Sequence, residues 1–234
     1  MRVARLLFAR LPERGAVKSR LAADLDNDSA FEIYRWLLRV QSRALATLPD
    51  RQNSFSNYVY YAPRAHRLKA RFAFSPDLKG LQLRFRAQSD GDLGARLAHA
   101  CADVLRDHDL ALVWGADIPC LPDGVEQQAI ALYPQSVITP ARDGGYAFVS
   151  IAAQNFSPAV FERIRWSTVH TGKDQIKALQ VAGLKPVISG KVADLDRAKD
   201  LPRVIRELEQ NGRDPDLHDL EQTLNRCAPK LSEQ

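Results

Sequence analysis

The apolar run from Leu110 to Trp114 is the feature of this sequence that most limits how the chain can fold. An uninterrupted run of this kind, followed by Gly115, is typical of a buried strand. Asp117 and Pro119 come directly after it. In open α/β sheets, ligands bind at the carboxyl ends of the strands. The run therefore predicts a buried strand with Asp117 beside a ligand, and a carboxylate there suits Mg²⁺ or Mn²⁺ carrying a phosphorylated substrate.

Strand and helix signals alternate along most of the chain. We expect strands at residues 3–9, 57–62, 81–87, 110–116, from 136 onward and at 185–189. We expect helices at about residues 28–48, 64–73, 92–107, after Pro122 and at 198–210, with two more between residues 151 and 185. Asp28 or Ser29 can cap the first of these helices, which would end near Leu48. Such alternation predicts an α/β fold, a three-layer α/β/α sandwich with a mostly parallel sheet.

Length and composition bound the number of domains and the kinds of ligand. The 234 residues are 45% hydrophobic and 26% charged, which is ordinary for a globular protein with a full core. We expect one domain over residues 1–210 and a polar C-terminal tail over residues 211–234, which packs as a separate small piece or is loose. A net charge of +5 suits anionic ligands. Basic residues are scattered rather than gathered with aromatics, so the sequence predicts no nucleic-acid partner.

Apolar runs and cysteines indicate the compartment. No apolar run approaches the roughly 20 residues needed to span a bilayer, so we expect no membrane span. Residues 1–10 carry too many charges for a signal peptide. Cys101, Cys120 and Cys227 are odd in number and lack metal-binding spacing. Reduced thiols in a cytoplasmic protein are therefore the expectation.

The segment from Arg10 to Arg20 follows the first expected strand and leads into a helix. A loop in that position presents free backbone N–H groups and the positive end of a helix dipole, which suits phosphate groups. Lys18 adds a mobile charge, and Arg20 adds a guanidinium that can hold a phosphate through two bonds. A solvated basic loop is the alternative. The segment contains neither a Walker loop nor a dinucleotide fingerprint.

Two further motifs combine acids with glycines. Residues 88–96 read Gln-Ser-Asp-Gly-Asp-Leu-Gly-Ala-Arg at a strand-to-helix junction, where Asp90 or Asp92 can cap the helix. Capping would explain only one acid and one glycine, so we expect ligand contacts here, with a structural role as the alternative.

Asp143-Gly144-Gly145-Tyr146 sets an acid and an aromatic ring beside two glycines, which let a backbone approach a sugar-like ligand. Together these segments point to a nucleotide-sugar site.

Six motifs occur in one order along residues 3–208. They are Phe8-Ala9-Arg10 with Gly15-Ala16-Val17-Lys18-Ser19-Arg20-Leu21, Gln88 with Gly91-Asp92-Leu93-Gly94-Ala95-Arg96, Gly115-Ala116-Asp117-Ile118-Pro119, Asp143-Gly144-Gly145-Tyr146, Trp166-Ser167-Thr168, and Asp194-Leu195-Asp196 with Asp200-Leu201. In this order the chain resembles a bacterial family of glycosyltransferase-A-like, uncharacterised transferases, known as selenodomain-associated transferase type one. The resemblance implies the nucleotide-diphospho-sugar transferase fold, related to nucleotidyltransferases that attach GMP or CMP to small substrates.

The resemblance also implies roles for individual residues. Asp117 would be the main ligand of Mg²⁺ or Mn²⁺ beside a nucleotide diphosphate, and Asp196 the second metal ligand. Asp143 would bind the acceptor or act as the catalytic base. Alternatives stay open: a strand-end turn for Asp117, a helix cap for Asp196 and a turn for Asp143. The substrate-binding residues would be Arg10, Gly15, Lys18, Arg20, Gln88, Asp92, Gly94, Arg96, Gly144, Gly145 and Tyr146.

The chain departs from the usual pattern of this family at several positions. Ser19 stands where the family usually has Thr, and Ala116 where it usually has Ser. Ser150 stands where it commonly has Gly, and Arg142 where it usually has an acid. The reversed charge at Arg142 bears on the acceptor or on the surroundings of the metal.

We expect a metal-dependent glycosyltransferase that uses a nucleotide-diphosphate sugar and an unknown acceptor. The alternative is a nucleotidyltransferase that joins a nucleoside monophosphate to a small phosphorylated substrate. The Gly-x-Gly-Thr-Arg loop of sugar nucleotidyltransferases is missing, which favours sugar transfer. A non-catalytic nucleotide-binding protein is the third alternative, favoured by Arg142 and opposed by Asp117, Asp143 and Asp196. The sequence carries no signal for an oligomeric state.

Overall fold

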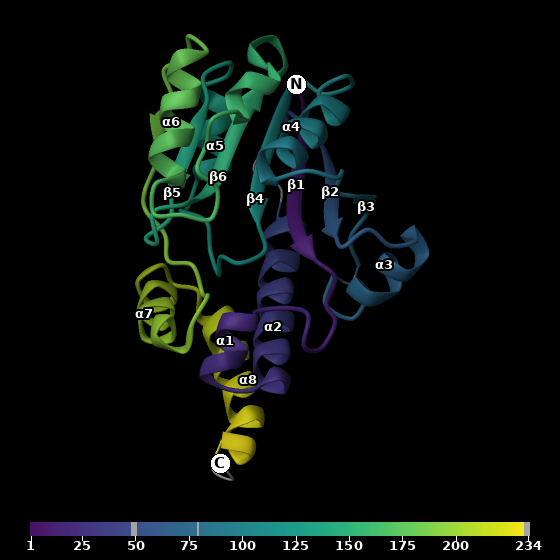
Figure 1. Ribbon diagram of the computed structural model, residues 1–234, viewed down its shortest axis with the longest axis vertical. Coiled ribbons are helices and arrows are strands. Elements are labelled where there is room, and N and C mark those ends of the chain that lie inside the picture. The colour runs from purple at the N-terminus through teal and green to yellow at the C-terminus, as the bar shows by residue number, and fades with distance from the viewer. Residues whose placement is uncertain (48–50, 79, 232–234) are drawn as a thin grey trace.

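The strands of the chain form one sheet in the order β3-β2-β1-β4-β6-β5-β7 (Figure 1). The computed structural model describes residues 1–47, 51–78 and 80–231. β6 runs antiparallel to both neighbours, whereas the other neighbouring strands are parallel, so the predicted α/β fold with a mostly parallel sheet is confirmed. The strands are β1 (Arg2–Arg10), β2 (Ser54–Ala62), β3 (Leu83–Ala87), β4 (Leu110–Gly115), β5 (Val137–Pro140), β6 (Tyr146–Ala152) and β7 (Val187–Ile188).

Helices cover both faces of this sheet, which confirms the predicted three layers (Figure 1). Successive side chains of a strand point to opposite faces. Val3 and Leu7 of β1 accordingly pack with α2, and Ala4 and Leu6 pack with α4 on the other face. In the described ranges, no helix is long and apolar enough to cross a bilayer. The helices are α1 (Ser19–Asp24), α2 (Asn27–Ala46), α3 (Arg67–Phe74), α4 (Leu93–Val104), α5 (Val125–Ala131), α6 (Thr171–Val181), α7 (Leu201–Gln210) and α8 (Asp214–Leu231), with the short 3₁₀ helices η1 (Ala153–Asn155), η2 (Pro158–Phe161) and η3 (Ala198–Asp200).

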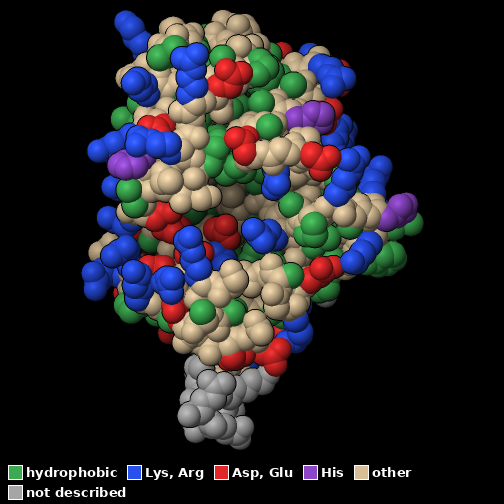
Figure 2. Space-filling view, viewed as in Figure 1, with side chains coloured by type: hydrophobic (Ala, Val, Ile, Leu, Met, Phe, Trp, Pro, Cys, Tyr) green, Lys and Arg blue, Asp and Glu red, His purple; other side chains and the backbone are tan. Residues whose placement is uncertain are grey.

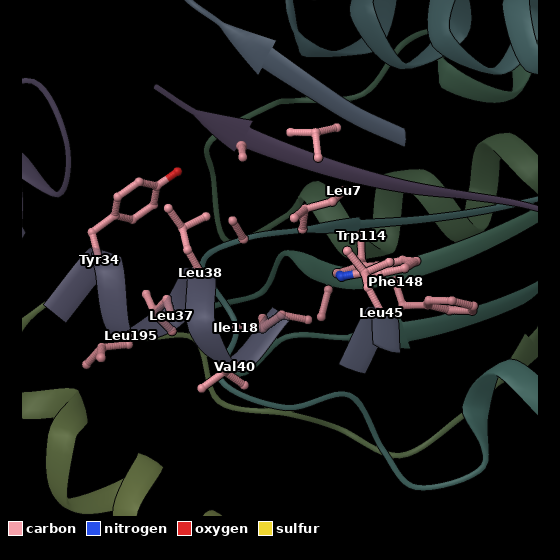
Figure 3. Packing of buried hydrophobic residues seen from close by; sticks show 14 of the residues in the cluster. Leu7, Tyr34, Leu37, Leu38, Val40, Leu45, Trp114, Ile118, Phe148 and Leu195 are labelled. Carbon is pink, nitrogen blue, oxygen red and sulfur yellow. The ribbon is translucent and has the colours of Figure 1, made fainter. Parts of the chain in front are cut away.

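α2 supplies much of the larger core. Its apolar residues repeat every three or four positions, so they share one face of the helix. Leu37, Leu38 and Leu45 are buried in one hydrophobic cluster with Leu7 and Trp114 of the sheet, and Leu45 lies beside Trp114 (Figure 3). The same helix therefore packs against both β1 and β4, the strand that precedes Asp117.

The beginning of α2 differs from the sequence prediction. Asp26 is the N-cap, rather than Asp28 or Ser29. Its carboxylate accepts hydrogen bonds from the backbone N–H groups of these two residues at 2.7 and 2.9 Å, because both N–H groups lie in the first turn and lack a helical partner. The helix ends at Ala46, and Leu48 lies outside the described residues.

A buried arginine joins the sheet to the carboxyl end of α2. Arg5, which is 1% exposed, donates to the carbonyl oxygens of Ala44 and Leu45 at 2.9 and 3.0 Å and to a Glu126 carboxylate oxygen at 2.8 Å. The final carbonyls of a helix lack helical partners and favour a cation. Burial raises the pKa of Glu126, and the charge of Arg5 opposes the rise. Arg5 thus satisfies a helix end and a buried carboxylate together.

The segment 211–234, predicted as a polar tail, contains α8. This helix packs along α2, with the Trp36 indole N–H donating to the Asp216 carbonyl oxygen at 3.0 Å. Arg39 of α2 also pairs with Asp219 of α8 at 2.8 Å. Apolar side chains of α8 belong to the same hydrophobic cluster as those of α2. The domain boundary before this segment stays a prediction, and the last three residues of the segment lie outside the described ones.

One edge of the sheet collects the segments that carry the sequence motifs. The carboxyl ends of β1 and β4 lie together there, since these strands are parallel. β6 is not among the strands predicted from the sequence. Because β6 is antiparallel, it brings its amino end, beginning at Tyr146, to the same edge. The fold therefore places the Arg10–Arg20 loop, Asp117 and the Asp143 loop on one side of the molecule.

Candidate functional site

The carboxyl ends of the central strands border a hollow in the surface, where cationic and anionic side chains gather (Figure 2). The loop after β1 begins at this edge. The Tyr34 hydroxyl fixes its start, donating to the Arg10 carbonyl oxygen at 2.8 Å and accepting from the Arg10 N–H at 2.9 Å. Burial raises the pKa of Tyr34, and the nearby charge of Asp117 adds to the rise. Tyr34 thus contacts the start of the loop and lies near Asp117.

Lys18 links three segments at this edge. Its φ of 52° lies in the left-handed region, which is uncommon for a residue with a side chain. Its ammonium lies 2.5 Å from an Asp117 carboxylate oxygen and donates to the Leu195 carbonyl oxygen at 2.7 Å. The Lys18 side chain is 3% exposed, whereas that of Asp117 is 68% exposed. Lys18 therefore holds Asp117 in place from the protein side and leaves most of the carboxylate open to solvent.

Arg20 and Asp196, predicted to bind phosphate and metal, form an ion pair at the rim of the site. Their side chains are 2.8 Å apart and are 63% and 39% exposed. The helical turn that follows begins after Arg197, so Asp196 does not cap it. Exposed ion pairs contribute at most about 1 kcal/mol to stability. Both side chains can therefore exchange this contact for a ligand at little cost.

An acidic cluster surrounds Asp194, a residue that the sequence analysis did not select. Burial and the charge of Asp143, with smaller contributions from Asp200 and Asp196, raise the pKa of Asp194 to about 6. Acids that repel one another in this way form a place where a cation is favoured. The motif Asp194-Leu195-Asp196 carried the signal, but its sequence does not show which of the two carboxyl groups has the raised pKa.

The stability of the ligand-free protein is expected to reflect this raised pKa. An unfolded Asp titrates near about 3.9, whereas Asp194 titrates at about 6 in the folded state. Between these values the folded state binds the extra proton, so the contribution of Asp194 to stability falls as the pH rises through 6. Asp194→Asn should therefore be more stable than the wild type near about pH 8, and this advantage should vanish near about pH 4. Urea unfolding at both pH values checks this, and an equal difference at both would contradict it.

The Asp143 loop takes its shape from close packing. Asp143 Oδ1 accepts the N–H of Gly145 at 2.7 Å, which closes a turn. A side chain at Gly144 would collide with the backbone of Val169, and the Gly144 carbonyl oxygen accepts the N–H of Gly172 at 2.8 Å. The turn considered for Asp143 is thus present, and its Oδ2 bonds to no described residue. The loop holds one carboxylate oxygen and leaves the second for other contacts.

Tyr146 follows this loop. Its ring lies 6.3 Å from that of Trp166, centroid to centroid. Its hydroxyl is buried, and no described residue hydrogen-bonds it. Burial raises the pKa of the Tyr146 phenol. The structure therefore places this predicted substrate-binding residue at the edge of the sheet with its hydroxyl inside the protein.

The motif at residues 88–96 makes its contacts within the protein. A side chain at Gly94 would collide with the Phe161 carbonyl oxygen and with the Trp166 indole. A cavity of about 510 Å³ lies beside α4 and is lined in part by Asp92 and Trp166. The polar side chains bond to backbone atoms: Asp92 to the Ala95 N–H at 2.8 Å, Arg96 to the Gly91 carbonyl at 2.9 Å and Gln88 to the Tyr60 carbonyl at 2.9 Å.

Arg142, where the resembling family usually has an acid, faces an acid in this structure. Its Nε donates to Glu207 Oε1 at 2.7 Å. The second oxygen of Glu207 accepts the N–H of Ala193 at 2.8 Å. Arg142 and Glu207 therefore tie α7 to the segment that leads into Asp194, and the positive charge of Arg142 is compensated.

Gln41 of α2 is a residue of the site that the sequence analysis did not assign. It is 3% exposed, and its amide donates to the Ile118 carbonyl oxygen at 2.7 Å while accepting the Trp114 indole N–H at 2.8 Å. These bonds fix the chain on both sides of Asp117. Its position among the apolar residues of α2 was the available signal, because a buried amide needs partners.

The acids fit a metal ion that arrives with a phosphorylated ligand. Among residues 1–47, 51–78 and 80–231, no three His, Cys, Asp or Glu side chains are arranged to hold a metal ion by themselves. Mg²⁺ is usually held by one or two carboxylates together with substrate phosphates and water. The exposed carboxylate of Asp117 and the mutual repulsion around Asp194 match that requirement.

Solved structures with similar folds come from several bacteria. A protein of Desulfovibrio desulfuricans G20, described as a candidate nucleotide-diphospho-sugar transferase, matches with a TM-score of 0.83 at 28% identity over 97% of each chain. A cytidylyltransferase of Leptospira borgpetersenii matches with a TM-score of 0.54 at 12% identity, over 91% of this chain and 96% of that one. The 4-diphosphocytidyl-2C-methyl-D-erythritol synthase of Anaerococcus prevotii matches with a TM-score of 0.53 at 12% identity, over 88% and 98%. No curated protein matches the chain.

These likenesses show that the chain has the fold of nucleotide-diphospho-sugar transferases and cytidylyltransferases, as the resemblance implied. A model of a family described as uncharacterized proteins conserved in bacteria, DUF2064, matches residues 45–168. This match covers more than half of the 234 residues. The chain belongs to this bacterial family, and it has the glycosyltransferase-A-like fold expected from the sequence motifs.

Proposed function

We propose that this protein is a metal-dependent glycosyltransferase that uses a nucleotide-diphosphate sugar. The observation that carries the proposal is the exposed Asp117 carboxylate after β4. The ammonium of buried Lys18 pairs with this carboxylate and holds it in place. Ligands of open α/β sheets bind at this edge. Likeness to the Desulfovibrio protein, at 28% identity over 97% of each chain, supports the same ligand class.

The donor diphosphate would lie between the loop after β1 and Asp117. Arg20 is exposed and would exchange Asp196 for a phosphate oxygen, and the backbone N–H groups around Gly15 add donors. Mg²⁺ or Mn²⁺ would be held by Asp117 with Asp196 or Asp194, and when bound it supplies positive charge that stabilises the leaving diphosphate. The loops beside the donor diphosphate would supply the other predicted substrate contacts, including those of residues 88–96.

Asp143 would act as the catalytic base toward the acceptor. It lies close enough to Asp194 for its charge to raise the Asp194 pKa, so it shares the same edge. Its free Oδ2 would take the proton from an acceptor hydroxyl while that oxygen attacks the anomeric carbon of the sugar. The bond from the anomeric carbon to the diphosphate oxygen breaks, and the nucleoside diphosphate leaves with that electron pair.

The test is incubation of the protein and Mn²⁺ with panels of nucleotide sugars and nucleoside triphosphates. Release of nucleoside diphosphate from a nucleotide sugar, abolished by Asp143→Asn with donor affinity retained, is the expected result. Release of pyrophosphate from a triphosphate would instead indicate a nucleotidyltransferase. Tight nucleotide binding without either product would indicate a non-catalytic nucleotide-binding protein.

Nucleotidyl transfer is the second candidate, because the same cradle of cations and acids would accept a nucleoside triphosphate. The missing Gly-x-Gly-Thr-Arg loop argues against it. The non-catalytic alternative rested on the positive charge of Arg142. Its pairing with Glu207 at 2.7 Å weakens that argument, since the charge of Arg142 is compensated.

Arg20→Ala is expected to weaken nucleotide binding about ten- to a hundredfold without unfolding the protein, because it removes one charge-assisted contact worth about 1.5–3 kcal/mol. Lys18→Ala should weaken binding to a similar degree and should also lower stability, since Lys18 is buried between Asp117 and Leu195. Titration calorimetry and urea unfolding measure the two effects. Arg14→Ala is the matched control, because Arg14 lies in the same loop but pairs with Asp28. Equal affinity in Arg20→Ala and the wild type would return this loop to an ordinary solvated surface.

A further inference from the structure

α3 turns an apolar ridge toward solvent. Leu68 and Phe72 are 56% and 74% exposed, whereas Ala70 and Phe74 of the same helix are fully buried. Residues four apart share a face of a helix, and residues two apart lie on nearly opposite faces. The exposed pair therefore points directly away from the core, where a solvated helix would carry its polar side chains.

Cationic side chains flank this ridge. Arg67, Lys69 and Arg71 are all exposed on α3. Arg67 and Arg71 form no ion pair with a described residue, and Lys69 pairs with Glu13 at 2.8 Å. Figure 2 shows blue and green side chains side by side on the lobe that α3 forms at one flank of the molecule. The basic residues of this segment are thus arranged around one apolar line.

We propose that α3 docks on the surface of a membrane rich in anionic lipids. Leu68 and Phe72 would enter the region below the headgroups, and Arg67 and Arg71 would lie against lipid phosphates. The combination selects this partner. A nucleic-acid duplex, whose bases are stacked inside, or an acidic peptide without apolar side chains would satisfy the cations and leave Phe72 in water, and a second copy of α3 would bring like charges together.

The position of α3 gives the docking a direction. α3 follows β2, whose carboxyl end lies beside that of β1. Its Lys69 also contacts Glu13 in the loop predicted to hold the donor phosphates. Docking through α3 would therefore bring the rim of the candidate site close to the membrane. If the proposed sugar transfer holds, the acceptor is a membrane-borne hydroxyl, a conclusion that rests on the proposed function.

Co-sedimentation with lipid vesicles tests the docking. The wild type should bind vesicles of phosphatidylcholine with about 30% phosphatidylglycerol, more weakly at high salt, and bind pure phosphatidylcholine poorly. Arg67→Glu/Arg71→Glu should weaken binding at least about 25-fold, since each lost cation counts for a factor of about five. Lys173→Glu/Lys177→Glu, the same change at the same spacing on exposed positions of α6, should leave binding unaltered.

The apolar ridge is tested separately. Phe72→Ser should weaken vesicle binding about tenfold or more, because a buried aromatic side chain is returned to water. Val181→Ser, at a 77% exposed position on α6, is the control and should bind as the wild type does. A tryptophan at position 72, in the variant Phe72→Trp, should be quenched by brominated lipids, and one introduced by Val181→Trp should not.

Three results would overturn the proposal. The first is failure of the wild type to bind anionic vesicles, or an equal loss in the α6 controls. The second is sensitivity to the charge reversal but not to Phe72→Ser, which would indicate a site for polyanions. The third is a dimer in sedimentation analysis that Phe72→Ser converts to monomer, which would assign the ridge to a self-interface. Donor turnover without vesicles should be unchanged in the α3 variants, and absence of turnover in the wild type would contradict the proposed function alone.

Discussion

Replacing Asp117 with asparagine is expected to lower the turnover of a nucleotide-sugar donor about a hundredfold or more. Loss of an outer contact to a metal ligand already costs about 10- to 100-fold, and Asp117 is proposed as the ligand itself. Asparagine keeps the size and an acceptor oxygen, so the contact with buried Lys18 survives and the fold should be retained. The expected loss therefore reports charge rather than shape.

Calorimetry of nucleotide binding separates the metal from the fold. The wild type should bind a nucleoside diphosphate more tightly with Mn²⁺ than without it, because acids beside a diphosphate repel it unless a cation lies between them. In Asp117→Asn this gain should largely disappear. Arg197→Ala, which removes an exposed cation paired with Asp24 near the same rim, should keep the gain. Equal affinity with and without Mn²⁺ in the wild type and in Asp117→Asn would mean that the acids are structural.

Arg5→Met is expected to destabilise the protein by about 3–5 kcal/mol, the usual cost of breaking a buried ion pair by removing one partner. The substitution leaves Glu126 buried without its cation and removes the donors of the Ala44 and Leu45 carbonyl oxygens. Burial already raises the pKa of Glu126, so without Arg5 this carboxyl would become protonated at a higher pH. Urea unfolding near neutral pH measures the loss.

Two further variants test whether the stability loss in Arg5→Met comes from the buried charge of Glu126. Arg5→Met combined with Glu126→Leu should recover part of the stability, since no charge is then left buried. Arg2→Ala is the control on the same strand, because Arg2 is 62% exposed and pairs only loosely with Asp109. It should change stability by less than about 1 kcal/mol. A loss in Arg5→Met no larger than that in Arg2→Ala would show that this pair contributes little.

The fold could be predicted where the sequence of a single segment indicates its secondary structure and its buried face. The apolar run at Leu110–Trp114 and the helical spacing in α2 reflect burial that the local sequence already encodes. β6 could not be recognised as antiparallel, because the direction of a strand is set by its neighbours and not by its composition. The packing of α8 on α2 escaped for a similar reason, since its polar surface includes acids that meet the arginines of a distant helix.

The candidate site was predictable in its location and less so in its contacts. Parallel strands bring their carboxyl ends together, so Asp117 and the loop after β1 could be placed at one edge. The pairing of Lys18 with Asp117 could not, because it depends on a left-handed backbone at a non-glycine residue. That Asp194 is the acid with the raised pKa also depends on tertiary packing, which determines how far water reaches each carboxylate.

The contact between α2 and α8 also has a consequence for synthesis on the ribosome. Trp36 and Asp216, which share a hydrogen bond, are 180 residues apart in the chain. At a translation rate of about 5–20 residues per second, roughly 10 to 35 seconds separate their emergence. During that interval the face of α2 around Trp36 has no partner helix and presents apolar surface. The nascent chain is therefore expected to rely on chaperones that bind this face until α8 is made.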